Sequence, residues 1–388
     1  MRRGPDVLVA EPSWRGHTLV FAAMIANQIR ETGRHVRLLV PELTDENRDQ
    51  IDVARELAHD EIDLRTGLRA FSSGFGRIFS KDSELVADSV LDAYEESGAK
   101  RLVLPTADAI ASMKPGTSQA AKMRSHQPRS VVHQPRLGYG GFGIRFAMGR
   151  EIMRSRMRRC GHHILTLDPL THRSAIKAGL DMGLVSFSTV KDTEMNRSEA
   201  RDLLGIPEKT RVISLLGEHS ARKGSLEVIQ AWPKNTDQDT TLLIMGSLSD
   251  SIRNELARRH DQVSSGRITV HDGFVSNKIF QAGFMASDVV TTLYPRHHGI
   301  SGVTEEAALY RRPVLGGDHG ANGTIIRQYG LGETIDATSP SQLRDALIKV
   351  LKQNPVVDQG RREDFIFQRH PDRIAEVVNT WIGLQDPA

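Results

Sequence analysis

The segment "HHGISGVTEEAALYRRPVLGGDHG" gathers residue types that bind charged and hydroxylated ligands. It follows the apolar run "DVVTTLYP", which predicts a strand, and its own apolar stretch predicts a helix. Gly299, Ser301 and Gly302 allow the backbone to approach an anion closely, and helix N–H groups from Val303 onward would point at the same anion. The segment therefore predicts a phosphate site at a strand-to-helix turn.

The acidic and imidazole side chains of this turn predict a second kind of contact. Glu306 lies one turn into the helix, where it would repel phosphate, so it is better suited to accept hydrogen bonds from ribose hydroxyls. The negative charge of Glu305 would stabilise the N-terminus of the helix. His298 stands at the mouth of the turn, where an imidazole can meet a phosphate or a sugar.

A second turn of this kind is "LLGEHSARKGSLEVI", in which a predicted strand ends at Gly217 and a predicted helix follows. Arg222 and Lys223 open that helix, and a cation there is tolerated best when an anion shares the position. We therefore expect Lys223 or Arg222 to hold a diphosphate, with an exposed loop as the alternative. The order of residues is not that of a P-loop.

The bulk composition sets limits on the class of protein. A chain of 388 residues suits two domains, and no apolar run is long enough for a membrane span. Near the start only Val7 to Ala10 is apolar, which predicts a strand and not a secretion signal. Cys160 is the only cysteine, so we expect a reducing, cytoplasmic setting. A net charge of +3 and 5% aromatic residues do not favour nucleic acid as a partner.

Short apolar runs alternate with amphipathic stretches along the chain, a pattern typical of parallel α/β sheets. The pattern restarts after the polar stretch from Ser188 to Thr210, which we interpret as an interdomain connection. We predict an α/β protein of two doubly wound, Rossmann-like domains facing a cleft. The predicted parts are residues 1–190, residues 191–365, and a C-terminal helix within 366–388 that packs back on the first domain.

The second half resembles the nucleotide-sugar domain of GT-B-fold glycosyltransferases, above all the retaining family-4-like group. The resemblance covers Ala200 to Gly332 and depends on the order of "LLGIPEKTRVISLLG", "RKG", "VHDGFV", "ASDVVTTLYP" and "EEAALYRRPVLGGDHG". By this resemblance Lys223 binds the diphosphate, Glu306 binds the ribose as the second glutamate of an E-x7-E motif, and Arg222 assists Lys223 because Glu218 replaces the family's arginine. The further donor-binding residues that it implies are Gly273, Phe274, Val275, Gly299, Ser301, Gly302 and Val303.

His298 stands where the family-4-like group has the first glutamate of its motif, which touches the donor sugar. "HGISGVTEE" also fits the H-G-G-x-G-T-x-x-E turn of a mostly inverting sister group, with Thr304 displaced by one position. The resemblance therefore implies a catalytic role for His298 together with Lys223 and Glu306, and the stereochemistry of transfer stays open.

The first half resembles the acceptor-binding domain of the same enzymes. The resemblance places the backbone of Gly16 against the donor, His17 at the base position of inverting relatives, and His133 against the transferred sugar. Asp108 and Asp168 follow predicted strands, so each is either an acceptor ligand or a helix N-cap.

These features together predict a metal-independent, retaining glycosyltransferase without a cofactor, acting between a nucleotide diphosphate sugar and a carbohydrate, lipid-linked or small-molecule acceptor. Three alternatives stay open: an inverting transferase, a nucleotide-sugar epimerase of the same fold, and an inactive nucleotide-sugar-binding partner protein. Separately, Ile144 to Cys160 carries six arginines against one glutamate. Phe146, Met153 and Met157 would form an apolar stripe beside them that contacts an anionic membrane, with a solvated helix face as the alternative.

Overall fold

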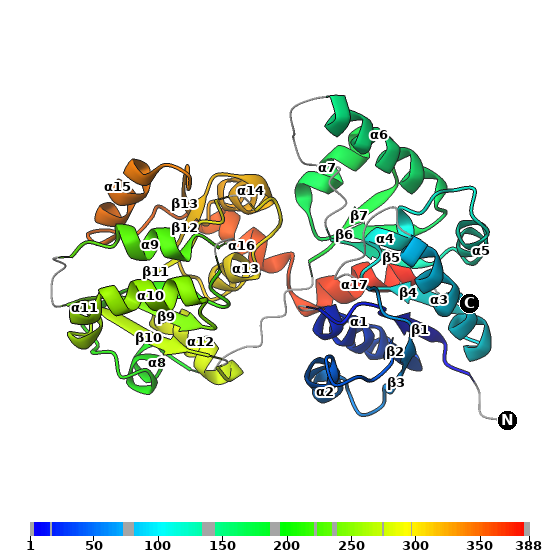
Figure 1. Cartoon of the computed structure of the whole chain (residues 1–388), viewed down its shortest axis with the longest axis horizontal. Helices are drawn as coiled ribbons and strands as arrows, with labels where there is room; N and C mark the ends of the chain where they lie inside the picture. The colour runs from blue at the N-terminus through cyan, green and yellow to red at the C-terminus, as the bar shows by residue number, and fades with distance from the viewer. Residues whose placement is uncertain are drawn as a thin grey trace. The chain divides into compact units, whose positions relative to one another are not determined.

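The structure is a computed structural model that describes residues 4–15, 18–72, 81–133, 144–186, 195–220, 223–234, 239–273, 275–295 and 297–383. The chain divides into two units (Figure 1). The first unit is Met1–Phe187 with Pro371–Ala388, and the second unit is Ser188–His370. Of the predicted site residues, Gly16, His17, Arg222 and Phe274 lie outside the described residues.

Within the described residues, the first unit is built on a 7-stranded sheet in the order β3-β2-β1-β4-β5-β6-β7. All of its paired strands are parallel. Its strands are β1 (Val7–Ala10), β2 (Val36–Pro41), β3 (Asp63–Leu68), β4 (Arg101–Leu104), β5 (Arg129–Val132), β6 (His163–Thr166) and β7 (Met182–Leu184). Its helices are α1 (Thr18–Glu31), α2 (Arg48–Leu57), α3 (Lys81–Ser97), α4 (Asp108–Ala111), α5 (Ser118–His126), α6 (Ile144–Arg159), α7 (Pro169–Lys177) and α17 (Pro371–Ile382).

The second unit repeats this plan with a 6-stranded parallel sheet, in the order β10-β9-β8-β11-β12-β13 among the described strands. Its strands are β8 (Arg211–Leu216), β9 (Thr240–Gly246), β10 (Ile268–Asp272), β11 (Val289–Thr292), β12 (Val314–Gly317) and β13 (Gly332–Ile335). Its helices are α8 (Arg197–Leu203), α9 (Ser225–Ala231), α10 (Asp250–Arg258), α11 (His260–Ser264), α12 (Asn277–Ala286), α13 (Gly302–Leu309), α14 (Gly320–Gln328), α15 (Pro340–Val350) and α16 (Gln359–Phe367).

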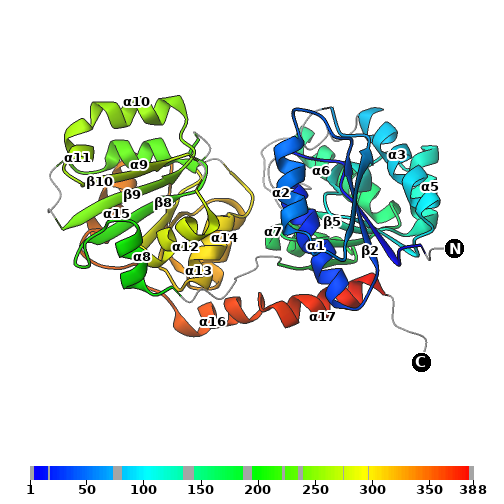
Figure 2. The same cartoon turned by 90° about the horizontal axis from the view of Figure 1, so that it is seen from below.

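Each sheet has an apolar core on both faces, because successive side chains of a strand point to opposite sides. In β1, Val7 and Val9 pack with α1, α2 and α17, whereas Leu8 and Ala10 pack with the helices of the other face. In the second unit, α9 and α10 cover one face of the sheet while α12 and α13 cover the opposite face (Figure 2). Each fully buried aliphatic side chain stabilises such a core by about 1.5–3 kcal/mol, so the buried strands fix the positions of their ends.

The strand order of each sheet reverses at one place, between β1 and β4 in the first unit and between β8 and β11 in the second. In doubly wound sheets, ligands bind beyond the carboxyl ends of the strands at such a switch point. The two Rossmann-like units confirm the predicted α/β fold class.

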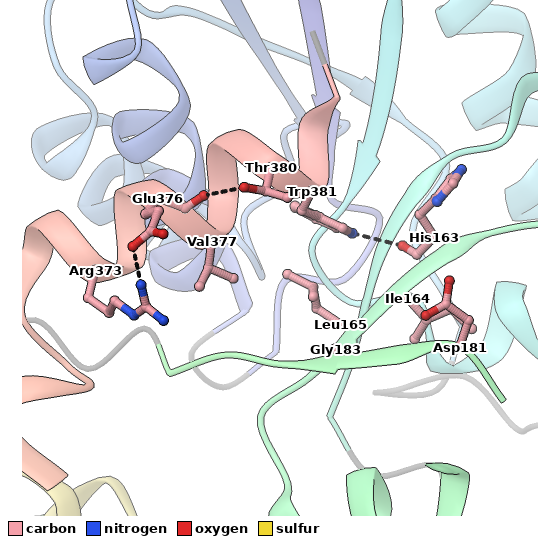
Figure 3. A pocket seen from close by; sticks show the side chains of 10 residues that line it. All are labelled: His163, Ile164, Leu165, Asp181, Gly183, Arg373, Glu376, Val377, Thr380 and Trp381. Atoms are coloured by element: carbon pink, nitrogen blue, oxygen red, sulfur yellow. Dashed lines mark hydrogen bonds and ion pairs between the residues drawn. The ribbon is translucent and has the colours of Figure 1, made fainter. Parts of the chain in front are cut away.

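The C-terminal helix α17 packs against α1 in the first unit (Figure 1). Trp381 Nε1 donates a hydrogen bond to the carbonyl of His163 at 2.9 Å, which ties α17 to β6. Between α17 and the β6–β7 edge lies a hollow of about 360 Å³, with Leu165 and Val377 on its apolar side (Figure 3). The helix thus returns the end of the chain to the first unit, and the second unit ends before Pro371.

The stretch interpreted as an interdomain connection contains a short helix, α8, which packs on α12 and contributes Ala200 and Leu204 to the core of the second unit. One sequence expectation needs correction. The stripe expected on α6 is wrong, because Met153 is 5% exposed and Met157 is 3% exposed, inside the core of the first unit. The side chain of Phe146 lies outside the described residues.

Candidate functional site

Two turns meet at the switch point of the second unit. β8 is followed by Gly217 and leads to α9, while the neighbouring β11 leads to α13. Gly217 has a φ of 92°, and a Cβ placed there would come to 2.9 Å from Lys223 Nζ and 3.6 Å from Val303 Cγ2. The Lys223 ammonium and the first turn of α13 therefore flank the same glycine, and a side chain at Gly217 would obstruct the space between them.

The position of Lys223 is set by the backbone around it. Its carbonyl accepts a hydrogen bond from Tyr294 N at 3.3 Å, and its Nζ lies 6.0 Å from the centre of the Tyr294 ring. Tyr294 has a φ of 46°, a left-handed conformation that is unfavourable for an aromatic residue and that recurs at functional sites. Gly224 caps α9 with a φ of 74°, and a Cβ there would meet Pro295 Cδ at 2.9 Å.

His219 fixes the loop that carries Lys223, and sequence reasoning did not single it out. Its Nε2 faces the carbonyl of Met245 at 3.1 Å, so Nε2 carries the proton, and its Nδ1 accepts from Ser225 Oγ at 2.9 Å. Burial is the main cause that lowers the pKa of His219 to about 4, and Lys223 adds to the effect. His219 is therefore a neutral positioning residue.

The N-terminus of α13 is open where an anion would bind. Ser301 is the N-cap: its Oγ accepts from Thr304 N at 3.2 Å and donates to the Tyr294 hydroxyl at 3.1 Å. Gly302 is exposed, and apart from its chain neighbours and its own helix backbone no atom of the described residues lies within 4 Å of the position its Cβ would take. Because the first N–H groups of a helix have no intrahelical acceptor, the amides of Gly302 and Val303 are suited to an anion.

A buried polar network holds α13 in this position. Thr304 Oγ1 bonds to Thr292 Oγ1 at 2.9 Å and to Asn322 Oδ1 at 2.6 Å. Asn322 Nδ2 donates to the carbonyl of Thr292 at 3.0 Å. The three side chains join β11, α13 and α14, and each is nearly inaccessible to solvent. Such a network favours one arrangement of the helix over others.

Glu305 and Glu306 are adjacent in sequence but differ in their surroundings. Glu305 forms a partly buried ion pair with Arg369, whose Nη2 lies 2.8 Å from Oε1. Glu306 is half-buried, and no described residue donates a hydrogen bond to its carboxylate, although its backbone carbonyl accepts from Tyr310 N at 2.8 Å. Burial is the main cause that raises the pKa of Glu306 to about 7, with a contribution from Glu305. Glu305 stabilises the fold, whereas Glu306 has hydrogen-bonding capacity left for a ligand.

His298 lies on the other side of the turn, at the carboxyl ends of β12 and β13. Its ring centre is 4.4 Å from that of His319, and its carbonyl accepts from Ala321 N at 2.8 Å. Gly299 follows it and is buried. His298 lines a hollow of about 360 Å³ together with Asp318, His319 and Asp336.

Gly273 and Val275, two of the residues expected to bind the donor, follow β10. Gly273 has a φ of 111°, and its N–H bonds to the carbonyl of Gly246 at 3.2 Å, so it continues the pairing of β9 and β10 beyond the strands. Val275 is half-buried and packs against the core that contains α12. Both residues therefore lie at the carboxyl edge of the sheet, on the β9–β10 side of the switch point.

In the first unit, the structure brings His133 and Asp108 together at the ends of β5 and β4. Asp108 Oδ2 accepts from His133 N at 2.9 Å. The His133 Nε2 lies 3.0 Å from the carbonyl of Pro105, so Nε2 is the protonated nitrogen and Nδ1 is left as an acceptor. Phe21 packs edge-on against the ring at 4.8 Å. His133 is held in one orientation with one nitrogen available.

Asp168 is engaged within the protein. Its Oδ1 accepts from Leu170 N at 2.9 Å and its Oδ2 accepts from Thr171 Oγ1 at 2.6 Å. The side chain is fully buried and caps α7. Of the two roles expected for Asp168, the structure shows that of a helix N-cap.

Glu11 is a further strand-end carboxylate that sequence reasoning missed. It follows β1 at the switch point of the first unit and is fully buried. Oε1 accepts from Ser13 N at 2.8 Å, whereas Oε2 has no hydrogen-bond partner among the described residues. Burial is the largest cause that raises the pKa of Glu11 to about 8, and Asp108 raises it further. The carboxyl is therefore mostly protonated at neutral pH. Its place directly after the first strand was the only signal in the sequence.

No group of three or more histidine, cysteine, aspartate or glutamate side chains among the described residues has an arrangement that could hold a metal ion. No helix in the described ranges is long and apolar enough to span a membrane.

Two Rossmann-like units, with a helix at the end of the chain packed on the first, define the GT-B fold. Residues 210–353 match the family model described as "Glycosyl transferases group 1". This match includes Lys223 and Glu306, and it supports the prediction that the chain is a glycosyltransferase. No curated protein matches the chain.

Solved structures show the same architecture. HepE of Anabaena, solved with UDP and glucose, has a TM-score of 0.66 at 14% identity, covering 98% of this chain and 100% of HepE. Sucrose-phosphate synthase of Thermosynechococcus elongatus has a TM-score of 0.67 at 13% identity, covering 97% and 98%. A putative UDP-N-acetylglucosamine 2-epimerase of Listeria monocytogenes has a TM-score of 0.60 at 12% identity, covering 100% and 99%. At these identities the likeness establishes the fold.

Proposed function

We propose that this chain transfers a sugar from a nucleotide diphosphate sugar to an acceptor hydroxyl, and that the donor binds at the switch point of the second unit. The observation that carries the proposal is the placement of Lys223 and the open N-terminus of α13 on two sides of Gly217. The family match over residues 210–353 and the UDP found with HepE support this assignment.

Each part of the donor has a counterpart in the site. The diphosphate would lie between Lys223 Nζ and the amides of Gly302 and Val303, because a helix N-terminus and a cation both attract anions. The ribose hydroxyls would donate to Glu306, whose hydrogen-bonding capacity is otherwise unused. The nucleobase of the donor would lie near Gly273 and Val275, since both residues are on the β9–β10 side of the carboxyl edge of the sheet.

The same groups would assist the chemical step. As the bond between the sugar carbon and the β-phosphate oxygen breaks, negative charge grows on the leaving diphosphate, and Lys223 and the helix amides stabilise it. We propose that this replaces a divalent metal and that transfer is retaining, with the acceptor proton passing to the leaving phosphate. Loss of turnover in the presence of EDTA would contradict metal independence. A product whose anomeric configuration is inverted, as measured by NMR, would contradict retention.

The tightest test of the proposal is a panel of UDP-, GDP-, ADP- and dTDP-sugars, measured for thermal stabilisation and nucleotide release. At least one donor should raise the melting temperature of the wild type, and at the same concentration it should raise that of Glu306→Ala less. Stabilisation by no nucleotide would overturn the proposal. Release of nucleotide without any acceptor, with an isomerised sugar as product, would favour the epimerase alternative, and binding without turnover would favour an inactive partner protein.

We also propose that α6 contacts an anionic membrane, through a different surface from the one the sequence suggested. Met148 is 58% exposed and Ile152 is 44% exposed on α6, and the exposed Arg159 lies on the same helix face by its spacing. Part of the arginine charge instead holds the helix in place, since Arg156 donates to the carbonyl of Ser112 at 3.1 Å and Arg158 donates to the carbonyl of Ala178. Co-sedimentation with phosphatidylglycerol vesicles should fall in Arg159→Glu, and unchanged binding would count against the contact.

A further inference from the structure

The switch point of the first sheet carries two neighbouring turns with buried polar side chains. The β1–α1 turn begins at Glu11, and the β4–α4 turn contains Thr106 and Asp108. Because β1 and β4 are paired and parallel, both turns leave the same carboxyl edge of the sheet. Glu11 is 0% exposed, Thr106 is 3% exposed and Asp108 is 6% exposed. The three side chains are therefore closed to solvent.

One carboxyl oxygen of Glu11 fixes the β1–α1 turn. Glu11 Oε1 accepts a hydrogen bond from Ser13 N at 2.8 Å. The carbonyl of Ser13 in turn accepts from Thr18 Oγ1 at 2.8 Å, and Thr18 is the first residue of α1. Glu11 is thus linked through Ser13 to the start of α1, so it holds the turn from the end of the strand to the beginning of the helix.

The other carboxyl oxygen of Glu11 and the hydroxyl of Thr106 are both buried and unsatisfied. Neither Glu11 Oε2 nor Thr106 Oγ1 has a hydrogen-bond partner among the described residues. Thr106 nevertheless lies near enough to Glu11 to lower the pKa of its carboxyl, through its side chain and its backbone N–H. Since buried polar groups are rarely left without partners, two such groups this close favour a hydrogen bond between the two turns.

The proton that burial keeps on Glu11 suits such a bond. A neutral carboxyl donates from one oxygen and accepts at the other, so Glu11 can accept from Ser13 N and bond to Thr106 at the same time. An ionised Glu11 would place a second negative charge near Asp108, which already raises the pKa of Glu11. Loss of the proton would therefore force the two turns apart.

The described charged groups around Glu11 offer little compensation for its ionisation. Asp108 is acidic, and the imidazole of His133 lies beyond it at the end of β5. On the other side, Arg15 in the β1–α1 turn is exposed, and α1 carries no charged residue before Arg30. The state of the Glu11 carboxyl is thus set mainly by burial and by Asp108.

The β4–α4 turn transmits its position to His133. Asp108 Oδ2 accepts from His133 N at 2.9 Å, and the carbonyl of Pro105 lies 3.0 Å from His133 Nε2. Ala107 N also donates to the carbonyl of Val131 at 2.9 Å. Backbone and imidazole of His133 are therefore both bonded to this turn, and the orientation of the ring depends on where the turn lies.

We propose that Glu11 is a positioning residue, whose carboxyl joins the β1–α1 turn to the β4–α4 turn and thereby holds His133 in the orientation used for sugar transfer. The inference rests on the proposed function and on the resemblance that places His133 against the transferred sugar. Glu11 itself is closed to solvent, so it acts through the two turns and touches no substrate.

The first test compares nucleotide release from the best donor, with water as the acceptor, in the wild type, Glu11→Gln and Glu11→Leu. Glu11→Gln keeps a donor and an acceptor, so its kcat should stay within about twofold of the wild type. Glu11→Leu fills similar space without hydrogen bonds, so its kcat should fall at least about tenfold with little change in the KM of the donor. The matched control is Asp168→Asn, another buried strand-end carboxylate of the first unit, and its kcat should equal that of the wild type.

Two further readouts separate positioning from general support of the fold. The kcat of the wild type should fall as the pH rises from about 7 to about 9, because Glu11 loses its proton near its pKa of about 8. Glu11→Gln should not show this fall. The backbone amide resonance of His133, followed by NMR, should shift over the same pH range in the wild type and stay in place in Glu11→Gln.

Three outcomes would decide against a part of this scheme. A folded Glu11→Leu that releases nucleotide at the wild-type rate would overturn the positioning role. The same pH dependence of the His133 amide resonance in the wild type and in Glu11→Gln would overturn it too, and this measurement needs neither substrate nor Glu11→Leu. Failure of the wild type to bind any nucleotide would instead contradict the proposed function, and the amide resonance would still decide whether Glu11 positions His133.

Discussion

The two sheets have the same strand order, but the polar side chains at their carboxyl edges have different roles. In the first unit Asp168 caps α7 with both oxygens, and Asp108 secures the backbone of His133. In the second unit the Glu306 carboxylate receives no hydrogen bond from a described residue, and Lys223 lies beside an open helix N-terminus. The difference teaches that a strand-end position alone does not make a ligand site. Unsatisfied hydrogen-bonding capacity at that position is the better indicator.

The largest expected effect is at Lys223. Lys223→Met should weaken binding of the best nucleotide diphosphate about 100-fold, because a hydrogen bond to a charged group contributes about 1.5–3 kcal/mol. Binding of the corresponding nucleoside, which has no phosphate, should change little. Titration calorimetry of both ligands measures the contrast. Lys278→Met is the control, since it removes an exposed lysine on α12. Equal losses of nucleotide affinity in the two variants would contradict a specific role of Lys223, and the carboxyl edge of the second sheet would then not be distinguished as a ligand site.

The second effect concerns Glu306 and is specific for the ribose. Glu306→Ala should weaken a ribonucleotide diphosphate about tenfold, the cost of losing a hydrogen bond to an ionised group. The 2′,3′-dideoxy analogue should bind wild type and variant equally, because it lacks the hydroxyls that Glu306 accepts from. A variant that weakens both ligands to the same extent would show that Glu306 only supports the fold.

Among the strands, the outermost ones were harder to predict from the sequence than the central ones. The central strands were recognised because they are continuous apolar runs buried on both faces, as "RVISLL" and "TTLLIM" are. β3, β7 and β13 were not recognised, because their residues are half-exposed or polar and carry little apolar signal. An edge strand is defined by the neighbour it pairs with, which the local sequence does not contain.

The candidate site divides in the same way. Lys223 and Glu306 were identified from two glycine-containing strand-to-helix turns and from the resemblance of those turns to the GT-B nucleotide-sugar domain. His219 and Asn322 were not, since their partners, Met245 and Thr292, are set by the packing of distant strands. The chain has 15 histidines, and the sequence gives no sign of which of them will be buried. Glu305 was expected to act on the helix end alone, and its ion pair with Arg369 depends on the tertiary fold.

A third prediction uses the protonation of Glu11 to test the first unit. The folded pKa of Glu11, about 8, lies above its ordinary value of 4.5, so between these values the folded state holds a proton that the unfolded state has lost. The stability of the wild type should therefore fall as the pH rises from about 5 to about 8, by up to about 1.4 kcal/mol per pH unit from this group.

Glu11→Gln removes that dependence and keeps the size of the side chain. Relative to the wild type, the variant should become more stable as the pH rises through this window, measured by urea unfolding at pH 5, 6, 7 and 8. Asp168→Asn is the comparison, since it replaces a buried carboxylate that is fully hydrogen-bonded. Parallel curves for the wild type and Glu11→Gln would show that Glu11 is ionised in the folded protein.

The smallest effect is expected at Asp168, and it separates capping from binding. Asp168→Ala should lower the free energy of unfolding by about 1 kcal/mol, because the side chain caps α7 through Leu170 N. Asp168→Ser, which retains a capping oxygen, should recover part of the loss. In both variants the turnover of the best donor should match the wild type when measured well below the melting temperature. If Asp168→Ala lost turnover with little change in stability, Asp168 would contact the acceptor. The two edges would then differ in how their ligand contacts are arranged, and both would be ligand sites.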